Sequence, residues 1–164
     1  MKFVFRLLMI TSFLSTILSA ETLKIGSSAP QVSAVDHFGN TINLGSALSE
    51  GITVVFFYPK AMTPGCTAQA CSLRDAWDEL QKFDIKVFGV SSDTAKTQAA
   101  FRDKYALPFT LIADRDQVVS KAFGKGRWSR QAYIFKNGEL VWKDLKASTG
   151  KQADDVLKAL PQFQ

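Results

Sequence analysis

A strand-to-helix junction near the middle of the chain constrains the fold more than any other feature. An apolar run over 52–58 ends at Pro59, and a short Thr-Pro-Gly loop over 63–65 leads into Cys66. The run predicts a buried strand, and the residues after the loop predict a helix over 67–83. Cys66 is therefore expected where a strand gives way to the first turn of a helix. Free backbone N–H groups and the positive end of the helix dipole favour a thiolate there, and the thiolate is the nucleophilic form of cysteine.

The rest of the chain predicts alternating strands and helices in a single domain. Strands are expected over 85–90, 109–112, 131–136 and 139–144, a hairpin over 32–44 before the core, and helices after 93, after 114–116 and over 153–160. Asn137-Gly138 marks the turn of a second hairpin because both residues tolerate a positive φ. The only histidine, His37, falls in a predicted turn, so we expect it at the surface and away from Cys66.

The motif around the two cysteines resembles that of a known family. Pro59-x-x-x-Thr63-x-x-Cys66 matches the peroxidatic-cysteine signature of peroxiredoxins, and the longer string 57–71, which ends at Cys71, resembles the bacterioferritin comigratory protein or peroxiredoxin Q subfamily. The resemblance covers roughly 23–160. It implies an α/β, thioredoxin-like fold with a central mixed sheet flanked by helices and an N-terminal hairpin. It also implies a peroxidase that reduces hydrogen peroxide and organic hydroperoxides by thiol chemistry.

The same resemblance assigns a role to each of five residues. Cys66 becomes the sulfenic acid, and Cys71 resolves it as an intramolecular disulfide. Thr63 hydrogen-bonds the sulfur and the peroxide oxygens, Pro59 shields the loop, and Arg130 lies against the sulfur. Neither a metal nor a haem or flavin cofactor is implied. The expected partners are the hydroperoxide and a thioredoxin-like dithiol protein that reduces the disulfide, and the expected state is a monomer.

Arg130 is the expected cation because it opens a predicted strand and stays ionised at any working pH. Arg127, three residues earlier, is an alternative for this role. The chain departs from its relatives nearby, with Gln131-Ala132 where an apolar residue and a serine are common, and with an unusual Trp128. We expect these departures to alter access to the site more than its chemistry.

The spacing of the cysteines bears on whether they form a permanent bridge. On a regular helix, residues five apart have Cα atoms roughly 8–9 Å from each other, whereas a disulfide requires about 7 Å or less. Cys66 and Cys71 therefore cannot bond until a helical turn unwinds. A catalytic cycle can use that mismatch, because the folded thiol form meets peroxide and an unwound form makes the disulfide.

Two other classes of protein remain as alternatives. A thioredoxin-like thiol–disulfide oxidoreductase without peroxidase activity would exchange with other disulfides and ignore peroxide. Such proteins usually have two residues between their cysteines, and this chain has four. A non-catalytic binding module would keep a permanent disulfide and be indifferent to the loss of Arg130.

The first twenty residues predict export. Lys2 and Arg6 precede an apolar stretch over 7–18, and Ala20 offers a small residue for cleavage before Glu21. We therefore expect a signal peptide over 1–20, a mature domain over 21–164 and, as the compartment, the bacterial periplasm. An uncleaved membrane anchor is the alternative, and after cleavage no stable membrane association is expected. Loss of the two basic residues would lower the net charge from +5 to +3, which gives no reason to expect nucleic-acid binding.

Overall fold

The computed structural model describes residues 21–164, so the predicted signal peptide over 1–20 lies outside the described residues. Within this range, seven strands form one mixed sheet in the order β2-β1-β5-β4-β3-β6-β7. The strands are β1 (Ser33–Asp36), β2 (Thr41–Asn43), β3 (Ile52–Phe57), β4 (Ile85–Ser91), β5 (Thr110–Ala113), β6 (Gln131–Lys136) and β7 (Glu139–Asp144). Strands β3, β4 and β5 run parallel, and the N-terminal hairpin β1–β2 and the hairpin β6–β7 add antiparallel pairs on either side. This is the predicted α/β, thioredoxin-like arrangement with an N-terminal hairpin, and it is confirmed.

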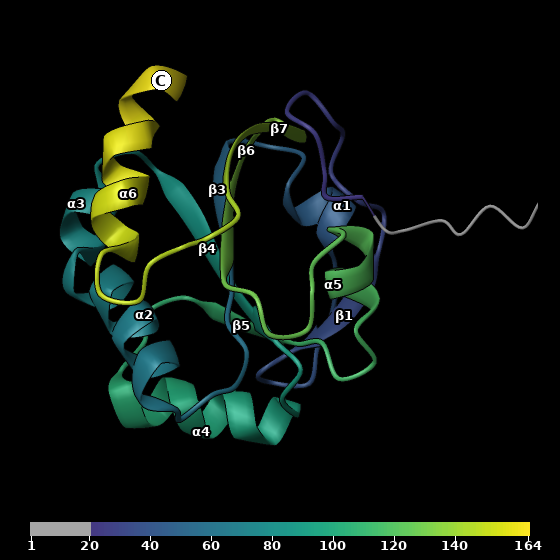
Figure 1. Ribbon diagram of the computed structural model, residues 1–164, viewed down its shortest axis with the longest axis vertical. Helices are drawn as coiled ribbons and strands as arrows, with labels where there is room; N and C mark the ends of the chain where they lie inside the picture. The colour runs from purple at the N-terminus through teal and green to yellow at the C-terminus, as the bar shows by residue number, and fades with distance from the viewer. Residues whose placement is uncertain (1–20) are drawn as a thin grey trace, which may run out of the picture.

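Helices cover both faces of the sheet (Figure 1). One core contains residues of α2, α3, α4 and α6, and the opposite core contains residues of α1 and α5. The helices are α1 (Leu44–Ala47), α2 (Pro64–Asp75), α3 (Trp77–Gln81), α4 (Ala95–Tyr105), α5 (Val118–Ala122) and α6 (Gln152–Ala159), followed by a 3-10 helix (Leu160–Phe163). Over residues 21–164, none of these helices has the length and apolar character needed to cross a bilayer.

Strand β3 lies inside the sheet, between β4 and β6, and is buried on both faces. Val54 and Phe56 pack into the core under α2 and α6, whereas Val55 and Phe57 pack into the core under α1 and α5. The continuous apolar run in the sequence reflects this two-sided burial, since side chains alternate between the faces of a strand. Because β3, β4 and β5 are parallel, the loops that follow them leave the sheet at the same edge.

The predicted helix over 67–83 is two helices. Helix α2 begins at Pro64, whose fixed φ suits the first position of a helix. The helical run is interrupted at Ala76, where φ is −96° and ψ is 13°, and α3 starts at the next residue. The earlier start leaves Cys66 in the first turn, as the sequence predicts.

His37 corrects one prediction, because the residue is buried, with 6% of its surface exposed. The Leu111 backbone N–H donates to its Nδ1 at 3.1 Å, and the His37 N–H donates to the Leu111 carbonyl at 2.9 Å. The turn that contains it is therefore held against β5 as part of the β1–β5 contact. Burial lowers the pKa of His37 from its ordinary value of 6.5, and the nearby Arg102 acts in the same direction.

A neutral, buried His37 predicts that acid destabilises the fold. The pKa is lower in the folded state than in the unfolded state, so the contribution is fully present above pH 6.5 and is lost as the pH falls below that value. We expect the free energy of unfolding, measured in urea at several pH values from 7.5 to 5, to fall more steeply in the wild type than in His37→Asn. Asn retains an acceptor for Leu111 but does not titrate. Parallel curves for the two proteins would contradict this prediction.

Candidate active site

Cys66 is the third residue of α2, the helix that follows β3 after a six-residue loop over 58–63. Its side chain is buried, with 1% exposed, and it belongs to the core between the sheet and α2. Thr63 is the N-cap residue, with extended φ and ψ of −82° and 150°, and the chain turns into the helix there. The sulfur therefore lies in the first turn of a helix, where backbone N–H groups are free and the dipole is positive.

Arg130 lies against this sulfur. Its Nη1 donates a hydrogen bond to Cys66 Sγ at 3.3 Å and another to Gln69 Oε1 at 2.9 Å. The sheet explains the placement: Gln131 of β6 is paired with Phe57 of β3, so the residue before β6 lies beside the end of β3. Arg127, the alternative, points its guanidinium at the exposed Trp128 ring, 5.3 Å from the ring centroid.

Gly65 gives the guanidinium its space. A Cβ at this position would lie 2.9 Å from Arg130 Nη2 and 3.3 Å from Thr149 Cγ2. Real Cβ contacts are not found that close to a nitrogen atom, so a larger residue would push Arg130 aside. Gly65 therefore leaves room for the guanidinium of Arg130, a residue from a distant part of the sequence.

Gln69 is a residue of the site that the sequence analysis missed. It is fully buried, and its amide Nε2 donates to Gln152 Oε1 at 2.9 Å and to the Phe57 carbonyl at 3.4 Å. Its amide oxygen accepts from Arg130. The available signal was its position three residues after Cys66, which places both side chains on the same side of a helix.

Thr63 and Pro59 lie in the loop between β3 and α2. The Thr63 hydroxyl donates to the Lys60 carbonyl at 2.9 Å and makes no capping hydrogen bond to the helix. Its backbone carbonyl accepts from the Thr67 N–H at 2.9 Å. Pro59 is half-buried and follows Tyr58, whose N–H still bonds to β4 through the Val90 carbonyl. Proline has no N–H of its own to continue that pairing.

The neighbouring loop after β4 fixes this segment. Asp93 accepts hydrogen bonds at 2.7 Å from the Ala61 N–H and from the Ser91 hydroxyl, through the same carboxylate oxygen. Met62, the next residue, adopts a φ of +64°, which is unusual for a residue other than glycine. The Asp93 carboxylate therefore holds in place the turn that contains Met62, four residues before Cys66.

Cys71 lies on the same helix and is half-buried, and both cysteines are free thiols. Burial raises the pKa of the Cys71 thiol, and this effect outweighs the opposing charge of Arg74. Because α2 is continuous from Cys66 to Cys71, the geometry of a regular helix keeps the two sulfurs apart. A disulfide between them requires this part of α2 to unwind.

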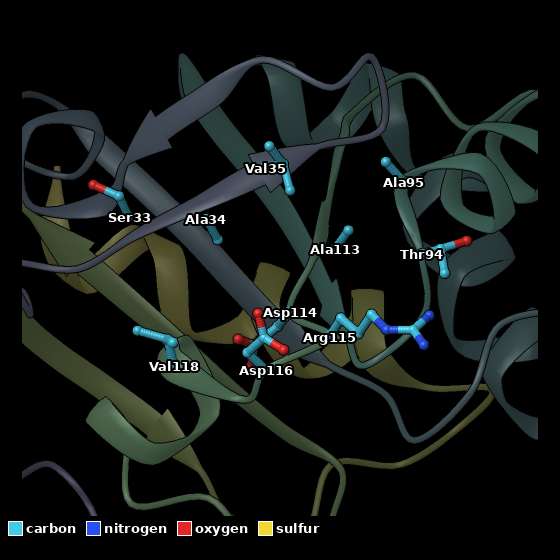
Figure 2. Close-up of a pocket in the computed structure, with 10 residues that line it drawn as sticks. All are labelled: Ser33, Ala34, Val35, Thr94, Ala95, Ala113, Asp114, Arg115, Asp116 and Val118. Atoms are coloured by element: carbon cyan, nitrogen blue, oxygen red, sulfur yellow. The ribbon is translucent and has the colours of Figure 1, made fainter.

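A cavity of about 270 Å³ lies elsewhere on the molecule, between β1, the start of α4 and the segment after β5 (Figure 2). None of the predicted site residues lines it. The buried Asp114 carboxylate at its edge accepts from the Val119 and Ser120 N–H groups and so serves the start of α5. The cavity is separate from the environment of Cys66.

Comparison with known proteins agrees with this geometry. The family model for the AhpC/TSA family matches residues 25–143. The chain is 43% identical over 114 residues to peroxiredoxin Bcp of Escherichia coli, an alignment that covers 70% of this chain and 71% of the relative. The crystal structure of peroxidoxin BcpB from Mycobacterium tuberculosis matches with a TM-score of 0.79 and 28% identity, over 87% of this chain and 99% of that one.

A second solved structure concerns alkyl peroxide reduction by the bacterioferritin comigratory protein of Xanthomonas campestris. It matches with a TM-score of 0.76 and 27% identity, over 85% of this chain and 96% of that one. Both solved neighbours thus cover most of this chain.

The contact between Arg130 and Cys66 predicts that this arginine controls the reactivity of the thiol. Arg130→Met should slow the oxidation of Cys66 by hydrogen peroxide about 100-fold, because it removes both the charge and a hydrogen bond to a charged group. Arg127→Met is the matched control and should react at the wild-type rate. Stopped-flow fluorescence or quenched intact mass gives the second-order rate constant. Slowing by Arg127→Met alone would transfer the role to that residue.

Proposed function

The chain belongs to the AhpC/TSA family and is a thiol-dependent peroxidase of the Bcp and peroxiredoxin Q type, and from this premise we propose how its own residues divide the reaction. Cys66 is the peroxidatic nucleophile, Cys71 resolves it, and Arg130, Thr63 and Pro59 form the surroundings of the sulfur. The observation that carries the proposal is the 3.3 Å contact from Arg130 to Cys66 Sγ at the start of α2.

The first step takes place in the folded helix. The Cys66 thiolate attacks the terminal oxygen of the hydroperoxide, so an S–O bond forms and the O–O bond breaks. The sulfur loses two electrons, and the leaving alkoxide or hydroxide takes up a proton. Arg130 stabilises the thiolate before attack, and fixed donors near the site stabilise the charge that develops on the oxygens. The product is the sulfenic acid, the first and reversible stage of cysteine oxidation.

The second step requires α2 to unwind between the two cysteines. Cys71 then attacks Cys66, the disulfide forms and water leaves. While α2 is intact, burial keeps the pKa of Cys71 raised, which holds this residue in the less reactive thiol form. Unwinding exposes the Cys71 thiol to solvent and brings it within bonding distance of Cys66. The same motion therefore removes the cause of the raised pKa and allows the disulfide to form.

We propose hydrogen peroxide and organic hydroperoxides as substrates, and a thioredoxin-like dithiol protein as the reductant that restores both thiols by exchange. The activity of the Xanthomonas neighbour toward alkyl peroxides supports the organic substrates. A monomer suffices for this cycle, since both cysteines and Arg130 belong to one chain. A thiol–disulfide exchange protein without peroxidase activity fits less well. Four residues separate the two cysteines, and the Arg130 guanidinium donates a hydrogen bond to the Cys66 sulfur.

Intact mass tests the cysteine assignments. One equivalent of hydrogen peroxide added to the reduced protein should remove two hydrogens within seconds, as the disulfide forms. Cys71→Ser should instead gain one oxygen and stall, and Cys66→Ser should show neither change on that timescale. A wild-type protein that stays reduced while it exchanges readily with a small disulfide would overturn the peroxidase cycle in favour of a disulfide carrier.

We also propose export of the mature domain, residues 21–164, to the bacterial periplasm. The support is the charged start, the apolar stretch and Ala20 before Glu21 in the sequence.

Expression of the full chain in a Gram-negative host tests this export. The periplasmic fraction should contain a protein whose mass begins at Glu21, and Leu14→Arg, which interrupts the apolar stretch, should keep the full-length chain in the cytosol. Recovery of the uncleaved chain with the membranes would favour the anchor.

A further inference from the structure

A line of three polar side chains, the half-buried Arg130 and the buried Gln69 and Gln152, leads from the sulfur to the start of the C-terminal helix. Arg130 donates to Gln69 Oε1 at 2.9 Å, and Gln69 Nε2 donates to Gln152 Oε1 at 2.9 Å. Gln69 and Gln152 are both fully buried. Gln152 is the first residue of α6, and it lies 83 positions away from Gln69 in the sequence.

The direction of these hydrogen bonds is dictated by the arginine. A guanidinium can only donate, so Gln69 must present its oxygen to Arg130. The amide nitrogen of Gln69 must then face Gln152, which has to accept. The consequence falls on Gln152: its own Nε2 is buried and has no hydrogen-bond partner among the described residues.

An unpartnered amide nitrogen in a core is unfavourable, and replacement by an apolar side chain of similar shape relieves it. Packing alone would therefore favour methionine or leucine at position 152. A glutamine is better only if its accepting oxygen is needed. The structure gives that oxygen one use, which is to fix the Gln69 amide in the orientation that accepts from Arg130.

We propose that Gln152 is a positioning residue for the peroxide step, which acts through Gln69 to hold Arg130 on Cys66. This inference rests on the role proposed for Arg130. Gln152 touches neither the sulfur nor Arg130 in any hydrogen bond, so its influence passes through the Gln69 amide. Without the acceptor at 152, the amide nitrogen of Gln69 keeps only its longer hydrogen bond to the Phe57 carbonyl, at 3.4 Å, among the described residues. The amide then rotates more readily, and Arg130 loses its hydrogen bond to Gln69 Oε1.

The hydrogen bonds from Arg130 to Gln69 and from Gln69 to Gln152 exist only while α2 is folded, with both cysteines reduced. Gln69 lies between Cys66 and Cys71, within the segment that unwinds to form the disulfide. Unwinding removes Gln69 from both Arg130 and Gln152. Gln152 should therefore affect the attack on peroxide, whereas the chemical step in which Cys71 attacks the sulfenic acid does not use it.

Gln152→Met and Gln152→Glu separate positioning from packing. Methionine keeps the volume, removes the unpartnered nitrogen and removes the acceptor. Glutamate keeps an acceptor at the same distance but introduces a buried charge. We expect Gln152→Met to change the midpoint of thermal unfolding little, because the removal of the unpartnered Gln152 nitrogen offsets the loss of an acceptor for Gln69 Nε2. The variant should nevertheless slow the oxidation of Cys66 by hydrogen peroxide about three- to tenfold, the effect of one net hydrogen bond. Gln152→Glu should be less stable and should react faster than Gln152→Met.

The Arg130→Met background provides the control. In that background Gln152→Met should have no further effect on the rate, because the residue through which it acts is gone. Gln152→Met at the wild-type rate, with Arg130→Met still slow, would overturn the positioning role alone. Arg130→Met at the wild-type rate would instead remove the arginine from the proposed mechanism. Additive losses in the double variant would show that Gln152 acts by a route that does not include Arg130.

Discussion

The antiparallel pairing of β6 with β3 is the constraint on which the site depends. It sets Gln131 opposite Phe57, so the residue before β6 lies beside the turn that begins α2. Arg130 thereby meets a sulfur that lies 64 positions earlier in the chain. The contact is held by strand register and not by local sequence, and a one-residue slip of β6 would send the arginine to the other side of the sheet. Gly65 completes the fit because it leaves the guanidinium room above the helix.

Helix α2 must satisfy two opposed requirements. Folded, it gives Cys66 a helix N-terminus, keeps Cys71 half-buried and places Gln69 against Arg130. Unwound, it lets the two sulfurs meet. The first turn is anchored by side chains outside the helix, since the loop before it is held by Asp93 and the Gln69 amide by Gln152. Substitutions at Asp93 or Gln152 can therefore change the free energy needed to unwind α2 while both cysteines stay in place. A segment such as α2 can open at a lower free energy than unfolding of the whole protein.

Much of this arrangement is visible in the sequence. The apolar run, Pro59 and the position of Cys66 predict a buried strand followed by a helix, and the Asn137-Gly138 turn predicts the hairpin that carries Arg130 at its start. Three features were not predictable from local patterns. Helix α2 breaks at Ala76, which has a high helix propensity. His37 is buried by its pairing with Leu111, and Gln152 faces Gln69. The burial of His37 and the contact of Gln152 with Gln69 depend on hydrogen bonds between distant segments.

The sequence by itself determined the identity of the reacting groups: a nucleophilic cysteine at a helix start, a second cysteine five residues on, and an arginine at the beginning of a strand. Those are matters of residue type, spacing and periodicity, which are local properties of a chain. The tertiary structure decided that Arg130 reaches the sulfur, that the Gln69 amide accepts from this arginine, and that Gln152 Nε2 is left without a partner among the described residues. Those follow from sheet register and from the packing of α6 on α2, because a hydrogen bond between residues far apart in sequence exists only once the fold has brought them within about 3 Å.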